Sequence, residues 1–244
     1  MLKQFIQKIF STFGYTLVRE GYSRWHPDRW HPDYLRQFEF HPRTVVDVGV
    51  AYGTPHPENH YFYESFPEAY FVLIEPLEEF EPYLQDILKK YTGTYFLTAL
   101  GSKEETRVIN LDPTWIERSS MYKRMPPELT SLPLSQREVP VTTLDALMER
   151  HLFQPPFGLK IDTEGFEFQI IKGASNFLRH TEFVIAEVPV AHRFEQSYSF
   201  TEFMDSMRSN RFYMCDILNI GRASRNEVIF MDAVFKCEDK SIIY

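Results

Sequence analysis

The sequence predicts an α/β domain built on a doubly wound, mostly parallel sheet. From position 43 onward, short apolar runs typical of buried strands alternate with longer connecting segments, as in strand, crossover, strand units. Several of these runs end in a carboxylate or a glycine, and the last two flank a short polar segment typical of a hairpin. At 244 residues with 43% hydrophobic residues, the chain is long enough to bury one sizeable core.

Five apolar runs are the expected parallel strands: 43–48, 70–74, 94–98, 157–161 and 182–186. Segments 82–90 and 166–179 have the pattern of helices. The late runs 212–218 and 228–235 are expected to pair as a hairpin that closes one edge of the sheet. If its turn is near residues 221–222, Cys215 faces the region of residue 229 rather than Cys237, which argues against a disulfide.

Composition limits the function classes. The net charge of -8 argues against a general nucleic-acid binder, which normally has a basic face or stripe. Only two cysteines occur, both in apolar runs, so reduced thiols and a cytoplasmic location are expected.

The first 42 residues are expected to form a helical and irregular cap, with the main domain over 43–244. Residues 2–13 carry an apolar stripe at helical spacing, too short and interrupted to span a bilayer. The stripe favours packing on the protein's own domain or on a second subunit in a homodimer; weak peripheral contact with an anionic membrane is the alternative. The near repeat at 25–28 and 30–33 (Trp-His-Pro-Asp) favours a cap packed by its tryptophans over a metal or substrate site.

Residues suited to binding and chemistry follow successive predicted strands. They are Asp47 to Gly49, Glu75, 99–101, Asp162 to Glu164, and Glu187. The carboxyl ends of parallel strands meet at one edge of an open α/β sheet, where ligands bind in the crevice at which the strand order reverses. Placement of five segments at that edge indicates a binding site there.

The first two segments predict a nucleotide-type cofactor. Gly49 and Gly53 permit a tight turn and close approach to a ligand. Glu75 follows Gly49 by 26 residues, about where an acid reaches both hydroxyls of a ribose; the alternative is an acid at a helix N-terminus before Pro76. The Gly-x-Gly-x-x-Gly pattern of dinucleotide sites is absent, and Asp47 would repel a pyrophosphate. Asp47 instead suits a cationic cofactor such as S-adenosylmethionine.

These residues make the chain resemble the FkbM family of S-adenosylmethionine-dependent methyltransferases over about residues 43–190. The matching segments are 46–49 with Gly53, 74–76, 99–101, 119–120, 141–145, 159–167, 171–174 and 187–188. The resemblance implies a Rossmann-like, seven-stranded class I methyltransferase fold with the last strand antiparallel. It also implies O-methylation of a sugar, glycan or natural-product hydroxyl, with cofactor contacts from Asp47, Gly49, Gly53, Glu75, Leu100, Ser120 and Asp162. Ala51 stands where the family usually has Asn, so that residue's hydrogen bond to the cofactor is absent or replaced.

Three charged residues are the catalytic candidates. The sulfonium methyl is already activated, so the protein must align an acceptor oxygen and help remove its proton. Asp162 and Glu164 are the candidates for base and acceptor orientation, and Lys160, on the same strand face as Asp162, could hold it ionised. A structural ion pair at a strand end is the alternative. Glu187 is assigned to the acceptor pocket, and Glu167 to capping the following helix.

No metal is expected, because His56 and His60 lack a third ligand and are separated by Pro57. Two other function classes stay open beside the methyltransferase: a nucleotide-dependent oxidoreductase, and a catalytically silent cofactor-binding scaffold. The silent scaffold would gain support if residues 25–33 blocked the crevice. The sequence specifies neither the acceptor nor the oligomeric state.

Overall fold

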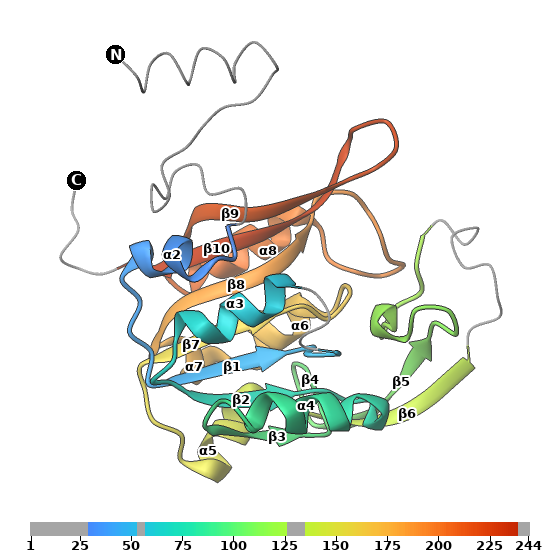
Figure 1. Ribbon diagram of the computed structural model, residues 1–244. Coiled ribbons are helices and arrows are strands. Elements are labelled where there is room, and N and C mark those ends of the chain that lie inside the picture. The colour runs from blue at the N-terminus through green and yellow to red at the C-terminus, as the bar shows by residue number, and fades with distance from the viewer. Residues whose placement is uncertain (1–28, 53–56, 126–134, 239–244) are drawn as a thin grey trace, which may run out of the picture.

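The computed structural model describes residues 29–52, 57–125 and 135–238, with the side chains of residues 57–60 left out (Figure 1). No helix in these stretches is long and apolar enough to cross a membrane.

A seven-stranded sheet forms the centre of the molecule, in the order β3-β2-β1-β7-β8-β10-β9. Its strands are β1 (Thr44–Val48), β2 (Tyr70–Ile74), β3 (Gly93–Phe96), β7 (Phe157–Ile161), β8 (Thr181–Pro189), β9 (Phe212–Arg222) and β10 (Val228–Cys237). The first five strands in this order run parallel, and β10 pairs antiparallel with both β8 and β9. The predicted doubly wound sheet with its antiparallel C-terminal hairpin is therefore confirmed.

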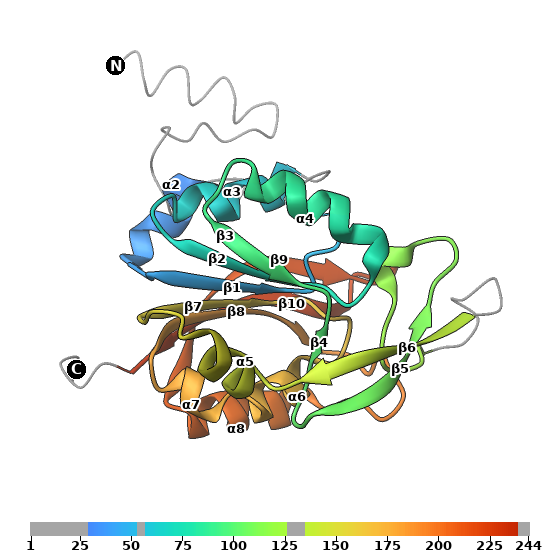
Figure 2. The ribbon, with the colours of Figure 1, turned by 90° about the horizontal axis from the view of Figure 1, so that it is seen from below.

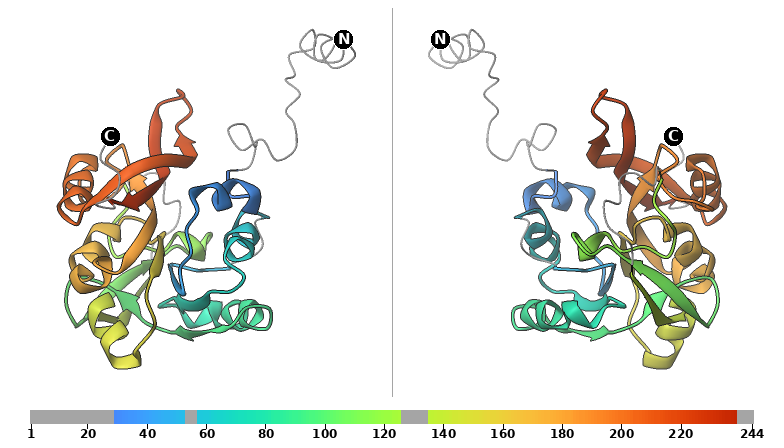
Figure 3. Two further views of the ribbon diagram at one scale, coloured as in Figure 1. Left: turned by 90° about the vertical axis from the view of Figure 1, so that its left-hand side faces the viewer. Right: turned by 90° about the vertical axis from the view of Figure 1, so that its right-hand side faces the viewer.

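Helices cover both faces of this sheet (Figures 2 and 3). One face carries α2 (Pro32–Leu35), α3 (Pro57–Ser65) and α4 (Glu81–Leu88), and the other carries α5 (Leu144–His151), α6 (Glu167–Lys172), α7 (Ser175–Leu178) and α8 (Phe200–Ser209). Side chains of β1 alternate between the two layers: Val45 packs in one hydrophobic cluster, and Val46 and Val48 pack in the other. Burial on both faces explains why this strand reads as an unbroken apolar run.

A second, three-stranded sheet lies at the carboxyl end of the main one and was not predicted (Figure 2). It consists of β4 (Ala99–Leu100), β5 (Glu105–Leu111) and β6 (Ser135–Thr142). Charged and polar residues of β5 and β6 are exposed, so neither segment has the apolar run of a core strand. Its buried side chains, among them Ile109 and Val139, pack against Leu77 and Phe80.

The predicted helix over 166–179 is two helices, interrupted at Gly173. A Cβ on Gly173 would lie 2.0 Å from the carbonyl oxygen of Gly101, so a residue with a side chain would push these backbones apart. The predicted strand over 94–98 ends two residues earlier, at Phe96.

The register prediction for the hairpin is wrong. The first strand continues through the expected turn to Arg222, so the turn lies at 223–227 instead of near 221. Cys215 consequently falls in a bulge opposite Val234 and Phe235 rather than near residue 229. Both cysteines are free thiols, as expected.

The described part of the N-terminal segment packs on α3 and the edge strand β9. Arg29 donates to the carboxylate of Asp216 and to the carbonyl oxygen of Ile217, and Trp30 packs edge-to-face on Phe62. Residues 2–13 and the first copy of the near repeat lie outside the described residues.

Candidate functional site

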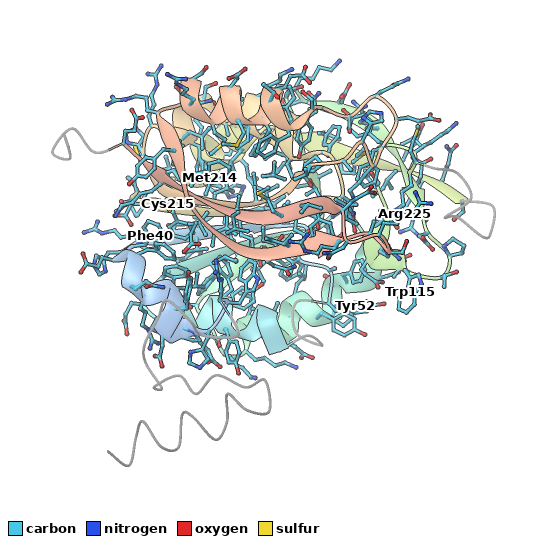
Figure 4. The ribbon with its side chains drawn as sticks, turned by 90° about the horizontal axis from the view of Figure 1, so that it is seen from above. Phe40, Tyr52, Trp115, Met214, Cys215 and Arg225 are labelled. Atoms are coloured by element: carbon cyan, nitrogen blue, oxygen red, sulfur yellow. The ribbon has the colours of Figure 1, made fainter. Side chains whose placement is uncertain are left out.

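A cleft lies where β1, β2 and β7 end and the small sheet begins, and its empty space, including the part open to solvent, is about 570 Å³. Apolar wall residues include Leu77, Phe80, Leu100, Ile109, Ile116 and Phe166, and polar ones include Glu75, Ser119, Ser120, Asp162, Thr163 and Glu164. Tyr52 and Trp115 lie at this end of the molecule (Figure 4).

Gly49 holds the ends of three strands together at the floor of the cleft. Its φ of 79° is in the left-handed region, and a Cβ would lie 1.8 Å from the carbonyl oxygen of Asp162. The Gly49 N–H donates to Ile74, and the Asp162 N–H donates to Val48, both at 2.9 Å. Only glycine allows this approach, so the predicted need for glycine here has a structural reason. Gly53, the second predicted glycine, lies outside the described residues.

Glu75 lies at the end of β2, 4% exposed, in the wall of the cleft. One carboxylate oxygen accepts from the Ala51 N–H at 3.0 Å and the other from the Leu77 N–H at 3.1 Å. Burial raises the pKa of Glu75 to about 7, although these two bonds lower it. Each oxygen keeps room for a second donor, so the pair can still accept from two ribose hydroxyls. The same carboxylate also supports the turn after Pro76, through the Leu77 N–H, and its contact with a ribose stays a prediction.

Ala51 occupies the turn after β1 with a φ of 48°, a left-handed conformation that Asn tolerates better than Ala. The family's usual Asn at this place therefore suits the backbone as well as any ligand. In this chain the backbone N–H of Ala51 provides the contact to Glu75.

Asp47 and Lys160 form a buried ion pair instead of the predicted contacts. The pairing of β1 with β7 sets them side by side, with 3.0 Å between the Lys160 Nζ and an Asp47 oxygen; Tyr63 donates to the other oxygen at 2.5 Å. Burial lowers the pKa of Lys160, but the neighbouring Asp47 and Asp162 raise it further, to above its ordinary value. Neither Asp47 nor Lys160 is part of the cleft wall. The structure thus places Asp47 behind the cleft wall and gives Lys160 a different direct partner from Asp162.

Asp162 is the open carboxylate of the site. It lies one residue beyond β7 and is exposed along the cleft wall, and no hydrogen bond from the described residues reaches its side-chain oxygens. Desolvation has the largest effect on Asp162 and raises its pKa. Glu164 and Asp47 also raise this pKa, whereas Lys160 and Arg193 lower it. Lys160 therefore favours ionisation of Asp162 through space, without a direct bond.

Glu164 is held by two arginines. Its carboxylate lies 2.8 Å from the Arg124 guanidinium and 3.0 Å from that of Arg193, and the same Arg193 also pairs with Glu187. Glu164 has a φ of 53°, and its carbonyl oxygen accepts from the Ser120 hydroxyl at 2.6 Å. Glu164 is thus a fixed anchor, unlike Asp162, and Ser120 supports it while lining the cleft.

Sequence reasoning missed both arginines. Arg124 lies in the long β5–β6 connection and Arg193 in the loop after β8, where no motif marks them. Only the fold brings these two loops together.

Glu167 is fully buried below the site. It accepts from the N–H groups of Thr163 and Gly165 and from the Tyr198 hydroxyl at 2.6 Å. It fixes the loop that carries Asp162 and Glu164, a more central role than capping the next helix. Among the described residues no cluster of three or more metal-ligating side chains occurs.

The fold is Rossmann-like and of the class I methyltransferase type. The model of the methyltransferase FkbM domain matches residues 47–214, so the chain belongs to the FkbM methyltransferase family. Its cofactor is S-adenosylmethionine, as predicted. No curated protein sequence matches the chain.

Solved methyltransferase structures are similar in fold at low identity. They include the 1,6-didemethyltoxoflavin N1-methyltransferase of Burkholderia thailandensis with S-adenosylhomocysteine (10% identity, 85% of this chain, 76% of that chain, TM-score 0.44). Fibrillarin of Aeropyrum pernix, with natively bound S-adenosyl-L-methionine, has 11% identity, 80% and 66% coverage and a TM-score of 0.43. The magnesium protoporphyrin IX methyltransferase of Synechocystis PCC 6803 has 9% identity, 97% coverage of both chains and a TM-score of 0.44.

Proposed function

We propose that this methyltransferase transfers the methyl group to a hydroxyl oxygen of a sugar, glycan or natural product. The observation that supports this most directly is Asp162, an exposed carboxylate in the cleft wall that accepts no hydrogen bond from the described residues and whose pKa is raised. A hydroxyl must lose a proton as it is methylated, and a carboxylate with a raised pKa is a stronger base than an ordinary one.

The residues of the cleft fit the cofactor. Glu75 would accept hydrogen bonds from the ribose hydroxyls, and the apolar side chains of Leu77, Phe80 and Leu100 would hold the base. Gly49 leaves the floor open for close approach. When bound, S-adenosylmethionine supplies a methyl group already activated by its sulfonium.

Asp162 would orient the acceptor hydroxyl and take its proton. The raised pKa of Asp162 brings it nearer to neutral pH, where a general base is most effective. Glu187 lies beside Asp162, because Ala186 and Ile161 are paired one residue earlier on β8 and β7. It would form the adjoining wall of the acceptor pocket.

Nothing described blocks the cleft. The described part of the 25–33 segment contacts Tyr61, Phe62 and Asp216, none of which lines the cleft. The silent scaffold therefore gains no support from this segment. A homodimer, and weak membrane contact through residues 2–13, stay predictions, as does the cytoplasmic location.

A methyl-transfer screen tests the proposal. The protein is incubated with S-adenosylmethionine carrying a ¹³C-methyl group and with panels of sugars, glycans and hydroxylated natural products. Products are analysed by mass spectrometry and by the NMR signal of the labelled methyl, which distinguishes an O-methyl from an N- or C-methyl. Amine analogues of each active hydroxyl compound are the matched controls. Transfer only to nitrogen or carbon would overturn the assignment of a hydroxyl acceptor.

A further inference from the structure

Arg193 connects the two glutamates of the acceptor side. One guanidinium nitrogen pairs with Glu187 at the end region of β8, and the other pairs with Glu164 at 3.0 Å. The side chain is only 13% exposed, and those of Glu187 and Glu164 are 10% and 15% exposed. Ion pairs this buried are screened little by solvent, so their charges act strongly on neighbouring groups.

Aromatic rings and a backbone pairing fix the guanidinium in place. Arg193 lies over the rings of Phe230 at 4.7 Å and Phe194 at 5.2 Å, and Arg124 lies over Phe194 at 4.9 Å. The Met125 N–H donates to the Arg193 carbonyl oxygen at 2.7 Å, joining the β5–β6 connection to the loop after β8. Arg193 therefore has little freedom to swing away from the two glutamates.

Charged groups approach Asp162 from every neighbouring element. The anions are Asp47 on β1, Glu164 in the same loop, Glu187 on β8 and Asp232 on β10. Asp47 is bound by Lys160 and Tyr63, and Asp232 lies opposite Glu187 in the pairing of β10 with β8. The cations are Lys160, Arg124 and Arg193. Lys160 is paired with Asp47, and Arg124 is paired with Glu164. Of these three cations, Arg193 is the one that contacts Glu187.

We propose that Arg193 is a positioning residue that offsets the repulsion of Glu187 and Glu164 and so keeps Asp162 negatively charged where the methyl acceptor binds. The inference rests on the proposed function, because it assigns Asp162 to the reacting side of the cleft. Without this arginine, Glu187 and Glu164 would lie beside Asp162 with Arg124 paired to Glu164 alone and with Lys160 paired to Asp47. Both Asp162 and Glu187 would then bind protons more readily, since Arg193 lowers the pKa of each.

The test needs no acceptor, because two ligands report the charge at Asp162. S-adenosylmethionine and S-adenosylhomocysteine share every group except the methyl and the positive charge on sulfur. The ratio of their dissociation constants, measured by calorimetry from pH 5.5 to 9, therefore reports negative charge near the sulfur. Glu75 contacts a part common to both ligands, so its titration cancels in the ratio. The preference for S-adenosylmethionine should fall as the acceptor-side carboxylates gain protons.

In Arg193→Gln we expect the pH midpoint at which the preference for S-adenosylmethionine falls to move up by about one pH unit. At a pH between the wild-type and variant midpoints, the variant should lose up to tenfold of this preference. Glu187→Gln should move the midpoint down. The double variant should lie near the wild type, because one charge of each sign is removed. Arg150→Gln breaks an exposed pair with Glu104, outside the cleft wall, and is the matched control with no expected shift.

A purely structural role predicts a different result. Arg193→Gln would then melt at lower temperature and bind both ligands more weakly, with the midpoint unchanged, and this outcome would overturn the inference. If Arg193→Gln does not fold, Glu187→Gln decides alone: a midpoint that stays or rises refutes the proposal. Failure of the wild type to bind either ligand would instead overturn the proposed function itself.

Discussion

The buried carboxylate of Glu75 is expected to make both the stability of the fold and the affinity for the cofactor depend on pH. Its carboxylate is 4% exposed, and burial raises its pKa from 4.5 to about 7. We expect Glu75→Gln to remove this titration while preserving the shape of the side chain. The amide oxygen can accept one of the two backbone N–H groups now bound, and the NH₂ group cannot accept the other, so part of the local turn is also weakened.

The sign for stability follows from the direction of the shift. A carboxyl group whose pKa is higher in the folded state binds protons more tightly when folded, so protonation stabilises the fold. The contribution of Glu75 is therefore fully present below about pH 4.5 and is lost as the pH rises through about 7. A shift from 4.5 to about 7 corresponds to about 3 kcal/mol in the free energy of unfolding. Between pH 4.5 and 8, the free energy of unfolding measured by denaturant titration should fall by about 3 kcal/mol more in the wild type than in Glu75→Gln.

Cofactor binding should follow the opposite trend. Hydroxyl groups donate best to an ionised carboxylate, so protonation of Glu75 competes with binding, and affinity should fall about tenfold per pH unit below pH 7. At pH 8 the variant should bind S-adenosylmethionine more weakly by about 1.5–3 kcal/mol, which is roughly 10- to 150-fold. Calorimetry across this range measures both effects. Equal affinity in the variant, with the same pH dependence as the wild type, would refute the assignment of the ribose to Glu75.

Four further changes have definite expectations. Asp162→Asn should lower turnover by roughly 10² to 10⁴ with little change in cofactor affinity, as single-turnover assays with calorimetry would show; normal turnover would exclude it as the base. Gly49→Ala should lower the free energy of unfolding by more than about 3 kcal/mol because its Cβ has no room beside the Asp162 carbonyl, and a near-native melt would contradict that packing. Ala51→Gly should stabilise the protein by about 1 kcal/mol in denaturant titration by relieving the left-handed backbone, whereas a loss would show that the strain is absent. Chelators should leave turnover unchanged, and activity restored by a stoichiometric divalent ion would redirect Asp162 to metal binding.

The sequence predicted the strand ends well because their signals are local. An apolar run followed by Asp47-x-Gly49, by Glu75 or by Asp162 needs no knowledge of distant partners. Parallel pairing then brings these residues to one edge of the sheet. The small sheet was missed because β5 and β6 are half exposed and alternate irregularly.

The partner of Lys160 shows why the details of the site needed the structure. The period of two along a strand places Lys160 and Asp162 on one face, but β7 ends at Ile161, so the pleat no longer determines where the Asp162 side chain points. The register between β1 and β7 sets Asp47 opposite Lys160, and register is a property of two segments more than 100 residues apart. The same reasoning applies to Arg124 and Arg193, whose loops are distant in sequence and meet only through the fold. Lys160 is bound by Asp47 and Glu164 by two arginines, whereas Asp162 accepts no hydrogen bond from the described residues, which is why we propose Asp162 for the acceptor. Three charged residues in one motif could not reveal this difference.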